Sequence, residues 1–216
     1  MNAFEFCKLY RFDTGDQIFE TVVYRKGSVH WLSLPSKDTN GRPLNGNNRD
    51  VYRSLRKVFP RLNFVSADQI HSNKVSSVKS QAEFEQKENC DGLVTEETNT
   101  ALIIRTADCI PVFIFNQKSI GLLHAGHKGI HTNILKSWNN DSSDDLSQLI
   151  VGDHIKSCCF KVRQDVEKLF RDLTQFNQNS IVKVNPSSSG TIEPNKIPII
   201  VVNCQTIHNV IPEPNK

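Results

Sequence analysis

Three side chains of metal-binding type stand at the ends of short apolar segments of this chain. His71 and His124 follow or end runs rich in β-branched and aliphatic residues, and Cys109 lies in a tight break between two such runs. The end of a strand is a rigid place to hold a ligand. Two imidazoles and one thiolate with a fourth position left open are typical of catalytic zinc. The pattern therefore predicts a zinc site, with copper as the less favoured ion.

Plainer interpretations of the same residues stay open. A single cysteine between apolar strands is commonly a small core residue, and a histidine at a strand end is commonly hydrogen-bonded or exposed. Cys109 and His124 are 15 positions apart, and Asn116-Gln117-Lys118 suits a hairpin turn between their strands. No spacing argument brings His71 to that pair. Without a metal, Cys109 could act as the nucleophile of a hydrolase with His124 as its base.

Neighbouring residues add candidates for catalysis and substrate binding. Asp108, next to Cys109, could act as a general base or orient an imidazole, or it could be a turn aspartate. In the segment Ala125-Gly126-His127-Lys128-Gly129, the glycines allow close backbone approach and Lys128 carries a positive charge. A helix starting near His127 would offer free N–H groups to phosphate. The alternative is an ordinary strand-to-helix turn. His131 stands four residues after His127, where a solvated helix face is the favoured interpretation.

The elements that must position these residues are short strands and a few helices. Runs of β-branched and aromatic residues bounded by turn formers predict strands at residues 5–10, 18–24, 29–34, 62–67, 74–78, 101–105, 112–115, 119–124, 149–151 and 198–203. Apolar residues at helical spacing predict helices at residues 48–59, 127–138 and 163–176. Strands outnumber helices and do not alternate with them regularly. The pattern thus favours an α+β fold with mixed sheets.

Composition narrows the class of protein. The 216 residues carry 26 basic and 23 acidic side chains, a net charge of +3, which is too mild to indicate a nucleic acid or an anionic membrane as partner. No segment approaches the ~20 apolar residues of a membrane span. We expect a cytoplasmic protein with one domain over residues 1–216. Six cysteines without a CxxC pair are expected to stay mostly reduced.

Five ordered segments resemble the motifs of the laccase-domain family, also called the polyphenol oxidase-like or purine nucleoside phosphorylase family. They are Gln69-Ile70-His71-Ser72, Asp91-Gly92-Leu93-Val94-Thr95, Thr106-Ala107-Asp108-Cys109-Ile110-Pro111-Val112, His124-Ala125-Gly126-His127-Lys128-Gly129 and Lys156-Ser157-Cys158-Cys159. The resemblance covers roughly residues 50–175. It implies a four-layer α/β/β/α fold with mixed sheets.

The resemblance also implies a function and its residues. His71, Cys109 and His124 would be the metal ligands, and the activity would be phosphorolysis of purine nucleosides, with adenosine deamination as a second activity. A bacterial branch of the family is associated with peptidoglycan maintenance. We assign Cys109, Asp108 and His124 to catalysis, and Gln69, His127 and Lys128 to substrate binding. A purine nucleoside and phosphate would be the partners.

Some positions depart from the family pattern. The early Thr-Arg-x-Gly-Gly segment is replaced by Leu34-Pro35-Ser36-Lys37-Asp38-Thr39, and His127 and Lys128 stand where Trp and Arg are usual. Lys128 keeps the charge but loses the planar fork of arginine. A degenerate, non-catalytic member is therefore an alternative. A multicopper laccase is disfavoured, because the chain has seven histidines, no His-x-His pair and only the methionine Met1.

Overall fold

The computed structural model describes residues 5–13, 18–26, 29–34, 39–40, 48–79, 82–116, 118–138, 148–155, 162–171 and 197–203. The segment Lys156-Ser157-Cys158-Cys159, most of the segment that replaces the early arginine motif, and residues 172–176 of an expected helix lie outside the described residues.

The larger sheet has seven strands in the order β1-β2-β3-β12-β8-β4-β6. These strands are β1 (Glu5–Asp13), β2 (Ile18–Lys26), β3 (Val29–Ser33), β12 (Ile197–Asn203), β8 (Thr100–Thr106), β4 (Asn63–Ala67) and β6 (Phe84–Lys87). The pairs from β1 through β12 to β8 are antiparallel, whereas β8, β4 and β6 run parallel to one another. The sheet is therefore mixed.

The smaller sheet has five strands in the order β11-β9-β10-β7-β5. These strands are β11 (Gln148–Val151), β9 (Ile110–Phe115), β10 (Ile120–Ala125), β7 (Gly92–Thr95) and β5 (Val75–Val78). β9 and β10 form an antiparallel hairpin, which confirms that the segments around Cys109 and His124 are adjacent strands. At its turn, Asn116 Oδ1 accepts hydrogen bonds from the backbone N–H groups of Lys118 and Ser119.

Alternating side chains place one core between the sheets and one on each outer face. On β8, Leu102 and Ile104 pack between the sheets, whereas Ala101 and Ile103 face the opposite way. On β9, Phe113 and Phe115 join the same inner core, and Val112 and Ile114 point to the outer face of the smaller sheet. This period of two is what strands buried on both faces require.

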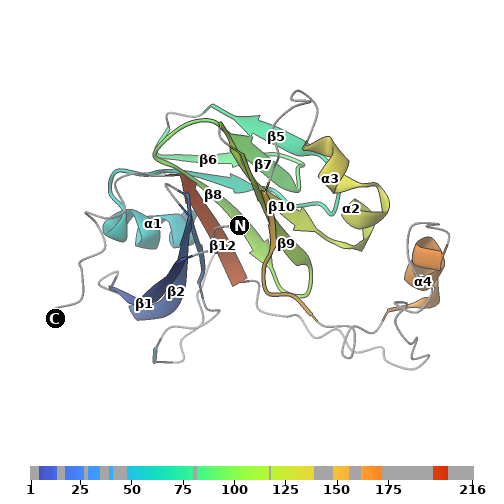
Figure 1. Cartoon of the computed structure of the whole chain (residues 1–216), viewed down its shortest axis with the longest axis horizontal. Coiled ribbons are helices and arrows are strands. Elements are labelled where there is room, and N and C mark those ends of the chain that lie inside the picture. The colour runs from blue at the N-terminus through green and yellow to red at the C-terminus, as the bar shows by residue number, and fades with distance from the viewer. Residues whose placement is uncertain are drawn as a thin grey trace.

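Helices cover the two outer faces and complete four layers (Figure 1). α1 (Asn48–Val58) packs Leu55 against the larger sheet. α2 (His127–His131) and α3 (Ile134–Ser137) lie on the smaller sheet, where Ile134 is 1% exposed. α4 (Gln164–Arg171) lies beside α2. The α+β fold with four α/β/β/α layers and mixed sheets is thus confirmed.

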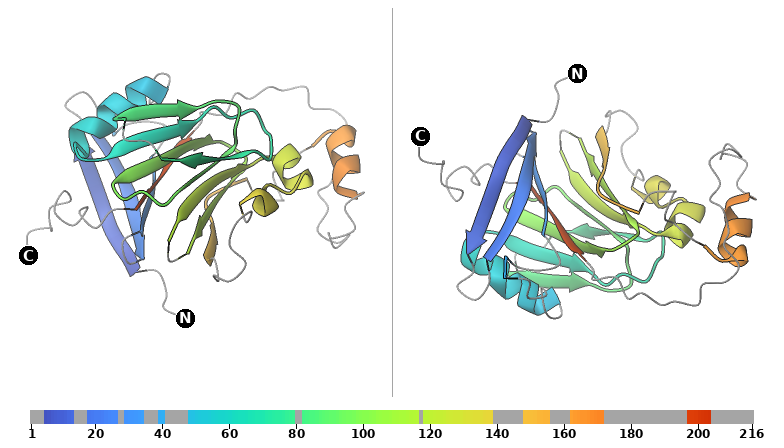
Figure 2. Two further views of the ribbon diagram at one scale, coloured as in Figure 1. Left: turned by 90° about the horizontal axis from the view of Figure 1, so that it is seen from above. Right: turned by 90° about the horizontal axis from the view of Figure 1, so that it is seen from below.

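The structure differs from the expected elements in two respects, and the place of one expected strand in the sheet could not be read from its position in the chain. The helix expected over residues 127–138 is broken, because Asn133 adopts left-handed φ and ψ of 60° and 59° between α2 and α3. β6 and β7 were not expected. β12 lies between β3 and β8 although it comes from far along the chain, as its red ribbon shows in Figure 2. In the part of the chain that the structure describes, no helix is long and apolar enough to cross a membrane.

The crossovers between the sheets gather at one edge of the molecule. The parallel strands β4, β6 and β8 of the larger sheet are each followed by a strand of the smaller one, namely β5, β7 and β9. Because the three strands are parallel neighbours, their crossover segments leave from the same end of the sheet. Residues 68–74, 88–91 and 107–109 therefore lie close to one another.

Candidate metal centre

The three candidate ligands meet at this crossover edge. His71 belongs to the crossover after β4, Cys109 to the crossover after β8, and His124 to β10 near its end. One ligand atom from each residue lies within 4.8 Å of the other two. Cys109 Sγ lies 3.8 Å from His71 Nε2, and the two imidazole ring centroids are 4.9 Å apart. The structure thus brings together three residues that could hold a metal ion.

The donor set and its spacing fit a tetrahedral ion. Bonds of ~2.1 Å to nitrogen and ~2.3 Å to sulfur place neighbouring nitrogen and sulfur ligands about 3.6 Å apart. The observed separation of Cys109 Sγ and His71 Nε2 is close to that value. Two imidazoles and a thiol are ligands that suit zinc, and they also suit copper.

A buried carboxylate, Asp91, organises two of the three ligands. Asp91 lies in the crossover after β6 and is fully buried. Its Oδ1 lies 2.8 Å from His124 Nδ1, so His124 presents Nε2 to the other ligands. The same carboxylate accepts hydrogen bonds from the backbone N–H groups of Ile70, His71 and Ser72 and from the hydroxyl of Ser72. Asp91 therefore ties the His71 loop to the imidazole of His124.

The hydrogen bonds also decide the charge of this carboxylate. Burial raises the pKa of Asp91, but hydrogen bonds from His124 and Ser72 outweigh it and lower the pKa to about 2. The bonded loop holds an unfavourable backbone conformation, since His71 has φ of 61°. A non-glycine residue pays about 1–2 kcal/mol for that conformation. The charged acceptor offsets this strain.

Gly126 lies directly against two of the candidate ligands, which is possible because it has no side chain. A Cβ atom at this position would lie 2.7 Å from Cδ2 of His71 and 3.3 Å from Sγ of Cys109. Gly126 is the N-cap residue of α2, so the first turn of that helix approaches both ligands directly. The glycine in this segment is therefore required by the ligands themselves.

Gln69, assigned from sequence to substrate binding, makes two hydrogen bonds within the protein. Its Nε2 donates to the backbone carbonyl of Arg105, and its Oε1 accepts from the N–H of the same residue. These bonds fasten the crossover that carries His71 to the end of β8, four residues before Cys109. Its contact with substrate stays a prediction.

The other predicted site residues lie around the cluster. His127 is half-buried, with its ring centroid 6.4 Å from that of His71, and burial and the neighbouring Lys128 lower its pKa. Lys128 and Asp108 are exposed. His131 lies in the same short helix, with its Nδ1 buried and unbonded. α2 has only five residues, so its N-terminus contributes little dipole for phosphate binding.

The sequence alone does not indicate a role for Asp91. The residue stood inside one of the five motifs, directly before Gly92, where an acidic residue commonly marks a turn. Its position immediately before the buried apolar run of β7 does indicate a bonded carboxylate, since an acidic side chain next to buried residues needs a hydrogen-bond partner.

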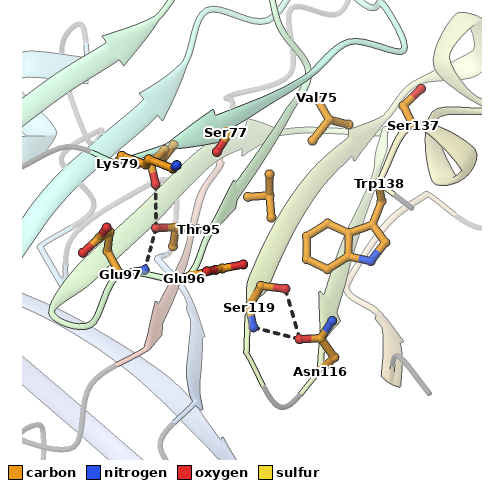
Figure 3. Close-up of a pocket in the computed structure, with 12 residues that line it drawn as sticks. Val75, Ser77, Lys79, Thr95, Glu96, Glu97, Asn116, Ser119, Ser137 and Trp138 are labelled. Carbon is orange, nitrogen blue, oxygen red and sulfur yellow. Dashed lines mark hydrogen bonds between the residues drawn. The ribbon is translucent and has the colours of Figure 1, made fainter. Parts of the chain in front are cut away.

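A cavity of about 380 Å³ lies apart from the cluster, at the other end of the smaller sheet (Figure 3). Its lining includes Ser77, Thr95, Glu96, Asn116 and Trp138, and none of the three candidate ligands. Its polar groups are largely engaged locally, because Thr95 Oγ1 donates to Val78 and Asn116 Oδ1 accepts from Ser119. The cavity adds no residue to the candidate metal centre.

Comparisons with known proteins agree with this architecture. YfiH of Bacillus licheniformis superposes with a TM-score of 0.54 at 18% sequence identity, covering 88% of this chain and 94% of that one. YlmD of Geobacillus stearothermophilus superposes with a TM-score of 0.56 at 17% identity, covering 87% and 92%. At such low identity these structures show the shared fold.

Relatives found by sequence similarity are named as enzymes. A purine nucleoside phosphorylase of Aquifex aeolicus is 31% identical over 85 residues, which is 38% of this chain and 41% of that protein. Purine nucleoside phosphorylase YlmD of Bacillus subtilis is 27% identical over 177 residues, 73% of this chain and 63% of that protein. The chain thus spans less than two thirds of the length of either relative.

A family match extends over most of the sequence. The model of the family described as multi-copper polyphenol oxidoreductase laccase matches residues 34–195, a span that contains all three candidate ligands and Asp91. With a match over well more than half of its length, this chain belongs to the multi-copper polyphenol oxidoreductase laccase family.

Proposed function

We propose that this protein is a zinc-dependent purine nucleoside phosphorylase. The observation that carries the proposal is the convergence of His71, Cys109 and His124, from separate segments, within 4.8 Å of one another. The names of the sequence relatives support purine nucleosides and phosphate as substrates. A zinc ion held by these residues would supply Lewis-acid chemistry.

The chain's own residues account for substrate binding in this proposal. His127, with its lowered pKa, is a flat and mainly neutral ring beside His71, which suits stacking against a purine. Lys128, exposed on the next position, would attract inorganic phosphate as a point charge. Asp108, exposed beside Cys109, could take up a proton during the reaction. Phosphate would then attack C1′ of the ribose and release the free base.

Metal analysis combined with a base-release assay tests the proposal. We expect protein purified without chelators to contain about one zinc per chain, and to release hypoxanthine from inosine only when phosphate is present. The variant Cys109→Ala should contain almost no zinc and release no base, because it lacks the thiolate ligand. Cys90→Ala is a matched control, since this buried cysteine lies in the core between the sheets. It should retain zinc and base release.

The same measurements separate the rival functions. Equal metal in wild type and Cys109→Ala would contradict the zinc site. A cysteine hydrolase would instead be favoured if the purified protein contained no metal and added zinc did not prevent labelling of Cys109 by a thiol-directed reagent. Cys109 Sγ lies 3.8 Å from His71 Nε2 and within 4.8 Å of a nitrogen of His124, so either imidazole could act as the base of such a hydrolase. Inosine formed from adenosine without phosphate identifies deamination. No release of base at high protein concentration would indicate a non-catalytic member.

A further inference from the structure

We propose that Asp91 is a positioning residue that assembles the metal site before an ion is bound. The inference rests on the proposed metal site and deepens it. It assigns the convergence of the ligands to the folded protein rather than to the ion. Asp91 is not proposed as a ligand of the ion, because its two carboxylate oxygens accept hydrogen bonds from donors of the protein.

Two hydrogen bonds join Asp91 to His124. Its backbone carbonyl accepts a hydrogen bond of 2.7 Å from the N–H of His124, and its side chain lies 2.8 Å from Nδ1 of the same residue. The backbone bond fixes the strand register, since Gly92 pairs with Leu123 in the next position. The side-chain bond then fixes the ring. An imidazole that donates through Nδ1 leaves Nε2 as an unprotonated ligand.

Asp91 also holds the loop that carries His71. Three consecutive backbone N–H groups, from Ile70 to Ser72, point at the two oxygens of this carboxylate. Successive amides around one anion form a concave binding arrangement. His71, in the middle, has the positive φ that turns its ring toward His124 and Cys109. The carboxylate is the acceptor for all three of these N–H groups, so its loss favours relaxation of the strained loop.

The described hydrogen bonds to the Asp91 carboxylate all come from groups of the protein. Asp91 and His124 are 0% and 3% exposed, so their hydrogen bond is shielded from water. Asp91 is attached to the crossover after β4, which carries His71, and to the strand β10, which carries His124. Loss of its charge would therefore release both imidazoles at once, while Cys109 stays in the crossover after β8.

Measurements on metal-free protein test the inference directly. We expect the amides of residues 70–72 to be protected from hydrogen exchange, and NMR of the ring nitrogens to show His124 protonated at Nδ1 and not at Nε2. In Asp91→Asn, the amide cannot accept from every donor, so this tautomer preference should be lost. Exchange of residues 70–72 in the wild type as fast as in unstructured chain would overturn the inference.

Zinc affinity supplies the second readout, measured by competition with a chromophoric chelator. Asp91→Asn should bind zinc ~10–100-fold more weakly than wild type. Asp68→Asn is the matched control, because it removes the same charge from the crossover after β4. The described hydrogen bonds of Asp68 are made by its backbone and not by its carboxylate. It should change affinity less than about twofold, well below the effect expected for Asp91, which holds two of the ligands. Wild-type affinity in Asp91→Asn would refute the positioning role. Failure of the wild type to bind zinc would refute the proposed function, while the metal-free measurements would still decide the inference.

Discussion

At the scale of single residues, the absence of a side chain at position 126 matters as much as the ligands. A methyl group there would lie 2.7 Å from Cδ2 of His71, well inside contact distance. We expect Gly126→Ala to displace the imidazole of His71 and weaken zinc binding at least ~10-fold, since ligands must be held within about 0.5 Å of the productive geometry. Chelator competition measures the change.

A second glycine provides the matched control. A Cβ at Gly121 would meet the ring of Trp138 at 2.0 Å, on the outer face of the smaller sheet and away from the ligands. Gly121→Ala should therefore lower the free energy of unfolding by about 1–3 kcal/mol, the usual cost of overpacking, and leave zinc affinity unchanged. If both variants lost zinc equally, general destabilisation rather than crowding of His71 would explain the loss.

The residue scale also shows which parts of the site the sequence could predict. Residue type and position at strand ends pointed to His71, Cys109 and His124, and the hairpin joined the last two. The approach of His71 could not be predicted from spacing, because it depends on three parallel strands crossing between sheets at one edge. The role of Asp91 depends on the same crossovers, so a motif alone could not assign it.

At the scale of elements, the interruption between α2 and α3 is caused by one residue. Asn133 adopts the left-handed conformation and its side chain accepts a hydrogen bond from the N–H of Lys136. Asn133→Ala removes this cap and keeps the backbone strain, so we expect the free energy of unfolding to fall by about 1–2 kcal/mol. Urea denaturation measures it.

Glycine at the same position separates strain from capping. Asn133→Gly also loses the side-chain cap, but glycine adopts positive φ without steric cost. Its loss of stability should be only a few tenths of a kcal/mol. If alanine and glycine were equally destabilising, the lost hydrogen bond rather than the backbone conformation would dominate.

Elements with strong local patterns were predicted well, and those defined by their neighbours were not. Ten predicted strands correspond to strands of the structure, with ends shifted by a few residues. β6, with the sequence Phe-Glu-Gln-Lys, is a short polar edge strand whose pairing with β4 gives it its conformation. β7 begins at Gly92 after Asp91, which looks like a turn in sequence. The break at Asn133 was hidden because apolar residues keep helical spacing across it.

At the scale of the whole molecule, the candidate ligands connect the two sheets. His71 and Cys109 lie on crossovers from the larger sheet, and His124 lies on a central strand of the smaller one. Zinc that binds only the folded chain should stabilise it by about 2.7 kcal/mol at a free concentration of 100 times Kd. For a chain of this size we expect Tm to rise by about 5–10 °C.

Calorimetry of metal-free protein with and without added zinc checks this expectation. Cys109→Ala should show little of the rise, because one link between the sheets is missing. An equal rise in the variant would mean that zinc stabilises the protein at other residues.

The place of β12 between β3 and β8 has a consequence for synthesis on the ribosome. β12 supplies hydrogen bonds to both neighbours, and β8 leads directly to Cys109. While residues 197–203 are still inside the ribosome, the edges of β3 and β8 that pair with β12 in the folded protein lack this partner. The crossover edge that carries the ligands therefore reaches its full rigidity only after residues 197–203, about 90 residues beyond Cys109, have emerged.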